Sequence, residues 1–313
     1  MKMHLRYTSF VVIITLSLTA CSLTTGEQTD LPYSSTMPAE ETSTYIVTGV
    51  QPTSTRQPTL LQTPTTFQPT WTAQPTLIGS NAIEAINHMI ATNGGCKLPC
   101  WWGITPGETS WENALILLSR FSPTVTSSGP FDLTRDANTR HTLMAYSVSY
   151  KIPDSRIGRG ASIDVLDDVV SIVYVGSEST GEIFTIPHLL SEYGEPANIF
   201  IKTYSDTPTG ILPFYIVLFY PDYQFTAIFE FEGNKAGETI SVCYSLTTPR
   251  LYAWSRDESK YVNNYRLNDW VLGSNNTGLK GIEEASSLNT GTFYQRFINA
   301  TSNTCFETPS SSW

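Results

Sequence analysis

Hydrophobic positions are distributed unevenly along this chain, and their pattern divides it into three parts. An apolar run of about nine residues, Phe10–Leu18, lies near the N-terminus. From about residue 22 to residue 76, apolar residues are sparse and follow no period. From about residue 80 onward they recur with helical or alternating spacing, which is typical of a folded domain. We therefore predict a leader at 1–20, a linker at 21–79 and one globular domain at 80–313.

The spacing within 80–313 predicts four helices and seven strands. Helical spacing and capping residues indicate helices over 81–92, from the box at Thr109 to about 121, 185–193 and 292–299. Alternation predicts strands over 142–150, 161–166, 169–175, 199–204, 212–220, 224–231 and 239–245. The segment 261–272 fits neither period. We expect Asp167-Asp168 to form the turn of a hairpin.

Helices followed by antiparallel hairpins predict an α+β fold with helices packed on one face of the sheet. The order of a helix and then strands occurs twice, at 109–175 and 185–245, which suggests a pseudo-repeat. The strands at 214–220 and 225–231 are apolar on both faces, so we expect both faces to be covered. The alternative is an exposed aromatic face that binds a partner.

The linker is rich in threonine and proline. Residues 22–76 contain 16 Thr and 7 Pro among 55 residues. Such a segment cannot bury enough apolar surface to offset its conformational entropy, so we expect a disordered tether.

The leader has the features of an export signal. A basic start with Lys2 and Arg6 precedes the apolar run, which is far shorter than the roughly 20 residues of a membrane-spanning helix. The stretch Leu18-Thr19-Ala20-Cys21 resembles the lipobox of bacterial lipoproteins. The resemblance implies cleavage before Cys21 and acylation of that cysteine, which would anchor the chain to the membrane. The alternative is an ordinary secretory signal with a chance cysteine.

Charge excludes one class of partner. Without Lys2 and Arg6 the chain holds 16 basic and 28 acidic residues, a net charge of about −12. An acidic protein is repelled by phosphate backbones, so we do not expect nucleic acid binding.

Four cysteines remain after Cys21, an even number in an exported protein, and they allow three pairings. We favour Cys96–Cys100, within a short loop that Pro99 keeps from being helical, and Cys243–Cys305, which would hold the C-terminal segment. Cys96 and Cys100 could instead form a redox pair or half a zinc site. Redox pairs usually have two intervening residues, and zinc needs two more ligands than this segment offers, so we favour a structural disulfide.

A second resemblance lies around this loop. The stretch from Cys96 to Thr109, C-K-L-P-C-W-W-G-I-T-P-G-E-T, together with Y-G-E-P at 193–196, resembles a signature of uncharacterised bacterial secreted lipoproteins. That family implies the same layout of lipobox, tether and domain, and it implies no activity. The G-E-T and G-E-P segments also resemble motifs of lipoproteins that assist outer-membrane protein assembly, which implies only a helix-on-sheet interaction fold.

Trp101 and Trp102 admit two interpretations. They could form a stacking platform for a glycan or peptide, or they could pack within the core. Adjacent residues in extended chain point to opposite sides, so we expect at least one buried indole.

Candidate catalytic and metal-binding groups are few. We find no motif for a nucleophile, a phosphate loop or a metal site, and we expect no cofactor and no metal. A hydrolase could use two of the carboxylates Asp164, Asp168, Glu182, Glu192 and Glu195. His188 and Glu192 lie one helical turn apart and could act as acid and base, but a solvated ion pair is the more common role of such a pair. Asp164, Asp167 and Asp168 could bind calcium, but their spacing fits a strand and an acidic hairpin turn better.

These observations predict a lipid-anchored, extracytoplasmic protein whose domain binds a protein or glycan ligand without enzymatic activity. The rival functions are a cell-envelope or polysaccharide hydrolase and an envelope-assembly lipoprotein that recognises another protein.

Overall fold

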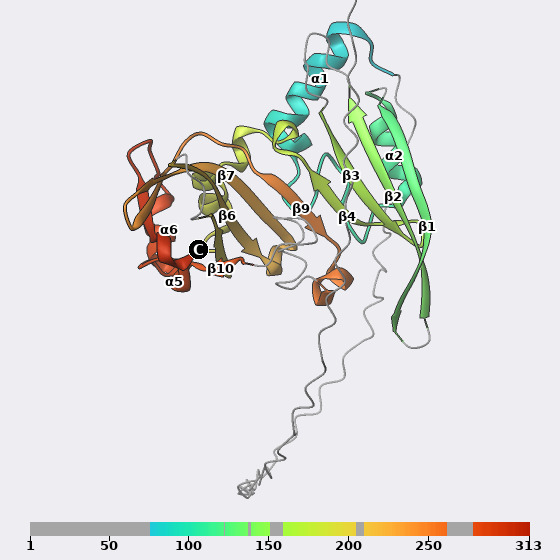
Figure 1. The fold of residues 1–313 in the computed structure, drawn as a ribbon. Coiled ribbons are helices and arrows are strands. Elements are labelled where there is room, and N and C mark those ends of the chain that lie inside the picture. Colours follow the sequence, from blue (N-terminus) through green and yellow to red (C-terminus); the bar gives the residue numbers. More distant parts are fainter. Residues whose placement is uncertain (1–75, 122, 137–138, 151–158, 205–209, 262–277) are drawn as a thin grey trace, which may run out of the picture. The chain divides into compact units, whose positions relative to one another are not determined.

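The computed structural model describes residues 76–313 except for 122, 137–138, 151–158, 205–209 and 262–277 (Figure 1). The helices are α1 (Gly79–Thr92), α2 (Trp111–Ser119), α3 (Ile186–Tyr193), α5 (Ile282–Ala285) and α6 (Thr290–Phe297). The strands are β1 (Thr124–Asp136), β2 (Thr139–Tyr150), β3 (Arg159–Leu166), β4 (Val169–Val175), β5 (Asn198–Lys202), β6 (Ile211–Tyr220), β7 (Phe225–Ala236), β8 (Thr239–Cys243), β9 (Arg250–Trp254), β10 (Lys280–Gly281) and β11 (Cys305–Pro309).

All the strands belong to one antiparallel sheet. Its order is β1-β2-β3-β4-β9-β7-β6-β5-β10, and β8 and β11 extend the far end of β7. The α+β class is therefore confirmed. A helix followed by four consecutive antiparallel strands occurs twice, as α2–β4 and α3–β8, and β9 joins the two halves by pairing with both β4 and β7.

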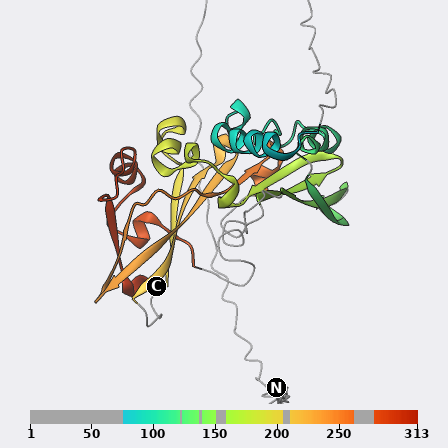
Figure 2. The same cartoon turned by 90° about the horizontal axis from the view of Figure 1, so that it is seen from above.

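The helices cover one face of this sheet, as predicted. Figure 2 shows α1, α2 and α3 on the same side of the strands. The main core contains apolar side chains from these helices and from α5 and α6, packed against one face of β2–β8. Two smaller clusters, centred on Ile172 with Trp254 and on Val217 with Ile228, lie on the other face and include no residue of the described α-helices. Val217 of β6 and Ile228 of β7 are buried, so these two strands are covered on both faces at that point.

Four strands escape the sequence pattern. β1 pairs only with β2 among the described residues, and most of its side chains are exposed, so it lacks an apolar alternation. β10 has only two residues, too few to establish a period, and β9 and β11 have five residues each and lie after residue 245, where the pattern predicted no strand. The start of α2 also differs by one residue, because Ser110 and not Thr109 accepts the capping hydrogen bond, from the backbone N–H of Asn113.

The predicted leader, the predicted acylation site at Cys21, most of the linker and the segment from 262 to 272 lie outside the described residues. Within the described ranges, no helix has the length and apolar character needed to cross a membrane.

Candidate functional site

The segment that carries the signature begins where α1 ends. Asn93, at the C-cap of α1, has a left-handed backbone with φ 52°, and this turns the chain out of the helix. The chain then enters a loop closed by a disulfide between Cys96 and Cys100. The second disulfide joins Cys243 of β8 to Cys305 of β11, which face each other in the strand register. Both pairs are the ones predicted.

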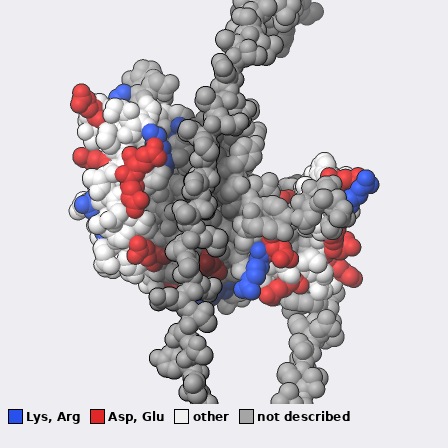
Figure 3. Space-filling model, turned by 90° about the horizontal axis from the view of Figure 1, so that it is seen from below, with Lys and Arg blue, Asp and Glu red and all other residues white. Residues whose placement is uncertain are grey.

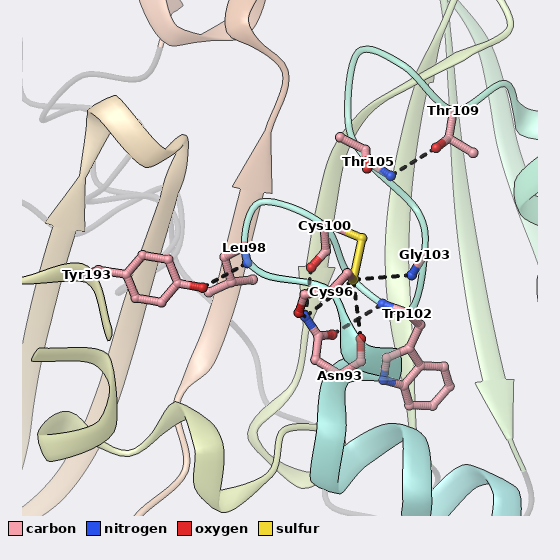
Figure 4. The surroundings of a disulfide bond; sticks show 9 residues. All are labelled: Asn93, Cys96, Leu98, Cys100, Trp102, Gly103, Thr105, Thr109 and Tyr193. Atoms are coloured by element: carbon pink, nitrogen blue, oxygen red, sulfur yellow. Dashed lines mark hydrogen bonds between the residues drawn. A yellow bond between two sulfur atoms is a disulfide. The ribbon is translucent and has the colours of Figure 1, made fainter. Parts of the chain in front are cut away.

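The side chain of Asn93 organises this loop (Figure 4). Its Nδ2 donates hydrogen bonds to the carbonyl oxygens of Cys96 and Cys100, each at 2.8 Å. Its Oδ1 accepts a hydrogen bond from the backbone N–H of Trp102 at 3.2 Å. Asn93 is 1% exposed, so these bonds form away from water, where an unpaired amide would be costly. The loop is thus held by a side chain that precedes it in sequence.

The tip of the loop contacts α3. The backbone N–H of Leu98 donates to the hydroxyl of Tyr193 at 2.8 Å (Figure 4), and the Leu98 side chain is buried. Lys97 forms an ion pair with Glu192 on the same helix. Burial is the main reason why the pKa of Tyr193 is raised, so its hydroxyl remains neutral at physiological pH. The loop therefore links the end of α1 to α3.

Trp101 and Trp102 are both buried, at 1% and 4% exposure. Trp102 and Gly103 have positive φ angles, and Trp101 and Ile104 exchange two backbone hydrogen bonds across them. This tight turn replaces the extended chain that we assumed, so the indoles stack on each other with centroids 4.5 Å apart. The expectation of at least one buried indole is confirmed. Neither indole offers an exposed surface for the ligand platform.

The predicted acids lie on separate elements. Asp164 is on β3, Asp168 is in the turn after it, Glu182 is in a 3₁₀ turn, and Glu192 and Glu195 are at and beyond the end of α3. Glu192 pairs with Lys97 and not with His188. Glu182 and His188 line one groove of about 550 Å³, which none of the other four acids lines. The structure does not bring the five carboxylates together.

The three acids weighed as calcium ligands, Asp164, Asp167 and Asp168, lie on β3 and in the turn after it. Asp167 and Asp168 have positive φ angles and form the hairpin turn between β3 and β4. The Asp167 carboxylate contacts His141 Nδ1 at 2.7 Å and accepts the backbone N–H of Thr142 at 2.9 Å. Across the described part of the chain, no three or more His, Cys, Asp or Glu side chains form a group that could hold a metal ion.

A groove that the sequence analysis missed lies where β6, β7 and β8 meet. It has a volume of about 740 Å³. Its polar lining consists of two carboxylates, one amide and three hydroxyls, from Glu230, Glu232, Asn234, Ser241, Ser245 and Thr247. Ile211 and Pro213 of β6 add apolar surface.

Strand geometry explains this lining. Glu230, Glu232 and Asn234 alternate along β7 with the buried Phe231 and Gly233, so the three side chains point to one face. In the register Asn234 pairs with Ser241 of β8 and Glu232 with Pro213 of β6. The alternation in Phe-Glu-Phe-Glu-Gly-Asn was the available signal. The groove forms only when β7 pairs with β6 and β8, and the alternation alone does not predict this pairing.

The groove has acceptor character and no described basic side chain in its lining. The hydroxyl of Tyr215 hydrogen-bonds to Glu230, and burial together with this carboxylate raises the pKa of Tyr215. Acidic side chains are spread over both ends of the face shown in Figure 3. The guanidinium of Arg250 lies 5.8 Å from the centroid of the Tyr215 ring but is not part of the lining. The groove is therefore better suited to a neutral or cationic ligand with many hydrogen-bond donors than to an anionic one.

Comparison of the chain with known family models, curated proteins and solved structures finds no match.

Proposed function

We propose that this protein is an extracytoplasmic lipoprotein, anchored through lipid on Cys21, whose domain binds a neutral glycan in the groove between β6, β7 and β8. The observation that carries the proposal is the lining of this groove by carboxylate, amide and hydroxyl groups. The proposed activity is binding without catalysis.

The chemistry of the groove favours a sugar. Vicinal hydroxyls donate well to carboxylates, and Glu230 and Glu232 present two of them on one strand face. Ser241, Ser245 and Asn234 add groups that both donate and accept. The apolar surface of Pro213 can pack against the C–H face of a sugar ring. A phosphorylated or otherwise anionic polymer would meet both carboxylates without a compensating cation in the described lining.

The ligand is tested with the full chain in detergent on an array of neutral and anionic glycans, followed by titration calorimetry. We expect neutral glycans to bind, and Glu230→Gln and Glu232→Gln each to weaken binding by about tenfold, the effect of losing a charge-assisted hydrogen bond. Glu108→Gln, an exposed acid in the turn before α2, is the matched control and should bind like the wild type.

Binding of anionic glycans alone, or equal binding by all three variants, would contradict the proposal. Release of shorter sugars during the titration would replace it with the hydrolase alternative, now using Glu230 and Glu232.

The anchor is tested separately. Wild-type protein expressed in a bacterial host with lipoprotein processing should partition into the detergent phase, and Cys21→Ser should appear as soluble or uncleaved protein. Equal partitioning of both would show that the membrane attachment does not depend on Cys21.

A further inference from the structure

The two sulfurs of the Cys96–Cys100 disulfide have different surroundings. The backbone N–H of Gly103 donates to Sγ of Cys96 at 3.4 Å, and Nδ2 of Asn93 lies 3.6 Å from the same sulfur while it donates to the two carbonyl oxygens (Figure 4). The backbone carbonyl oxygen of Asn93 also lies 3.2 Å from this sulfur. In the described part of the chain, no N–H donates to Sγ of Cys100. Hydrogen bonds from N–H groups stabilise a thiolate, whereas a carbonyl oxygen opposes one. Because two N–H groups face Sγ of Cys96 against this one oxygen, we take Cys96 to be the better leaving group of the two.

Both cysteines are half-buried and lie beside the exposed Lys97, so a small thiol can approach the bond. The loop is also fixed by contacts that do not involve sulfur. Asn93 holds both cysteine carbonyls, and the backbone N–H of Leu98 bonds to Tyr193. These contacts remain when the S–S bond is open, so the two thiols would stay close enough to close it again.

We propose that Cys96–Cys100 is a reversible thiol–disulfide exchange site, at which an incoming thiolate attacks Sγ of Cys100 and Cys96 leaves. This inference does not depend on the proposed glycan groove. The three intervening residues count against a redox catalyst. The pair is instead a substrate for a dithiol reductant.

The exchange has two steps. The sulfur of one thiolate of the dithiol bonds to Sγ of Cys100, and the electron pair of the Cys96–Cys100 bond passes to Cys96, which leaves as a thiolate. The second thiolate of the reductant then attacks its own mixed disulfide and displaces Cys100 as a thiolate, which takes up a proton at neutral pH. The dithiol is oxidised to a disulfide and the protein pair is reduced by two electrons. A disulfide oxidant reverses both steps.

The first test determines which sulfur is attacked. The full chain in detergent is treated briefly with glutathione, quenched in acid, alkylated and mapped by mass spectrometry. We expect the glutathione adduct on Cys100 and the alkyl group on Cys96, with about a tenfold excess over the opposite pattern. The peptide that links Cys243 to Cys305 should stay intact and serves as the internal control. Equal adducts, an excess on Cys96, or no opening of Cys96–Cys100 before the control disulfide would overturn the proposal.

The second test uses the single-thiol variants Cys96→Ser and Cys100→Ser, which keep the backbone carbonyls that Asn93 binds. Circular dichroism confirms that each is folded. We expect the lone Cys96 thiol to react with iodoacetamide about tenfold faster at pH 7 than the lone Cys100 thiol, with a lower apparent pKa. Equal rates, or the opposite order, would show that the donors at Cys96 do not stabilise its thiolate. These variants also give a result if the mixed disulfide is too short-lived to trap.

Discussion

Two aromatic residues beside the disulfide loop are packed without complete hydrogen bonding. The hydroxyl of Tyr150 and Nε1 of Trp101 are buried and have no hydrogen-bond partner among the described residues. Tyr150 lies at the end of β2, with its ring 5.6 Å from that of Trp102 and 6.0 Å from that of Phe121. Ring packing stabilises this cluster, whereas the burial of the unpaired Tyr150 hydroxyl costs free energy.

We expect Tyr150→Phe to stabilise the protein at pH 7 by about 1 kcal/mol, because it removes a buried unpaired hydroxyl and keeps the ring. Burial raises the pKa of Tyr150 well above its usual value of 10.0. Below pH 10 the phenol is neutral in both the folded and the unfolded chain, so its ionisation does not affect stability. As the pH rises from 10 toward the folded-state pKa, only the unfolded chain loses this proton, and the free energy of unfolding falls.

Urea unfolding at pH 7 and at several values above pH 10 checks this. Stability of the wild type should fall above pH 10, and the fall should be shallower in Tyr150→Phe. Equal slopes would show that Tyr150 is accessible to hydroxide in the folded protein.

At the scale of secondary structure elements, the two disulfides differ in what they connect. Cys96 and Cys100 are four positions apart and close a loop that other contacts already hold. Cys243 and Cys305 are 62 positions apart and tie β11 to β8. Chain entropy therefore predicts a larger stabilisation from the second bond.

We expect Cys243→Ala with Cys305→Ala to cost about 4 kcal/mol, and Cys96→Ala with Cys100→Ala about 2 kcal/mol. Calorimetry measures both. Hydrogen exchange should also become faster in β11 in the first double variant, where Phe306 still packs on Phe293 and Phe297. A larger loss from the second double variant would contradict the entropic account.

The sequence predicted the elements whose pattern is local. The hairpin around Asp167-Asp168 and the strands of β6 and β7 follow from turn residues and alternation alone. β1 was missed because an edge strand with exposed side chains needs no apolar face. The groove was missed because Glu232 and Ser241 meet only once β6, β7 and β8 are paired, and no spacing along the chain encodes that meeting.

At the scale of the whole domain, β9 is the strand through which the two halves form one sheet. Ala253 pairs with Val173 of β4 on one side and with Phe225 of β7 on the other. The N–H of Ser255 donates to Ser171 and that of Trp254 donates to Gln224. Because successive N–H groups alternate in direction along a strand, the N–H of Ala253 faces β4.

We expect the wild type to unfold in urea as one transition by fluorescence and circular dichroism, because the sheet and main core are continuous. Ala253→Pro removes the N–H that faces β4 and should lower the free energy of unfolding by about 3 kcal/mol or more. The transitions followed by fluorescence and by circular dichroism should then no longer coincide. Ala253→Gly keeps this N–H and should cost only about 1 kcal/mol, with a single transition. Similar effects of both variants would show that the hydrogen bond does not couple the halves.

The position of Asn93 before Gly94 has a consequence for the chemical lifetime of the protein. In an Asn-Gly sequence the following backbone nitrogen can attack the side-chain amide carbon and expel ammonia, and water then opens the resulting succinimide to aspartate or isoaspartate. While the chain is folded, the amide is buried and bonded to the carbonyls of Cys96 and Cys100, so it is protected. In the unfolded chain it is not, and an aspartate there would direct a carboxylate at two carbonyl oxygens. Each unfolding event therefore exposes Asn93 to an irreversible change that prevents this loop from re-forming. The lifetime of the native protein is then limited by the rate at which the domain unfolds.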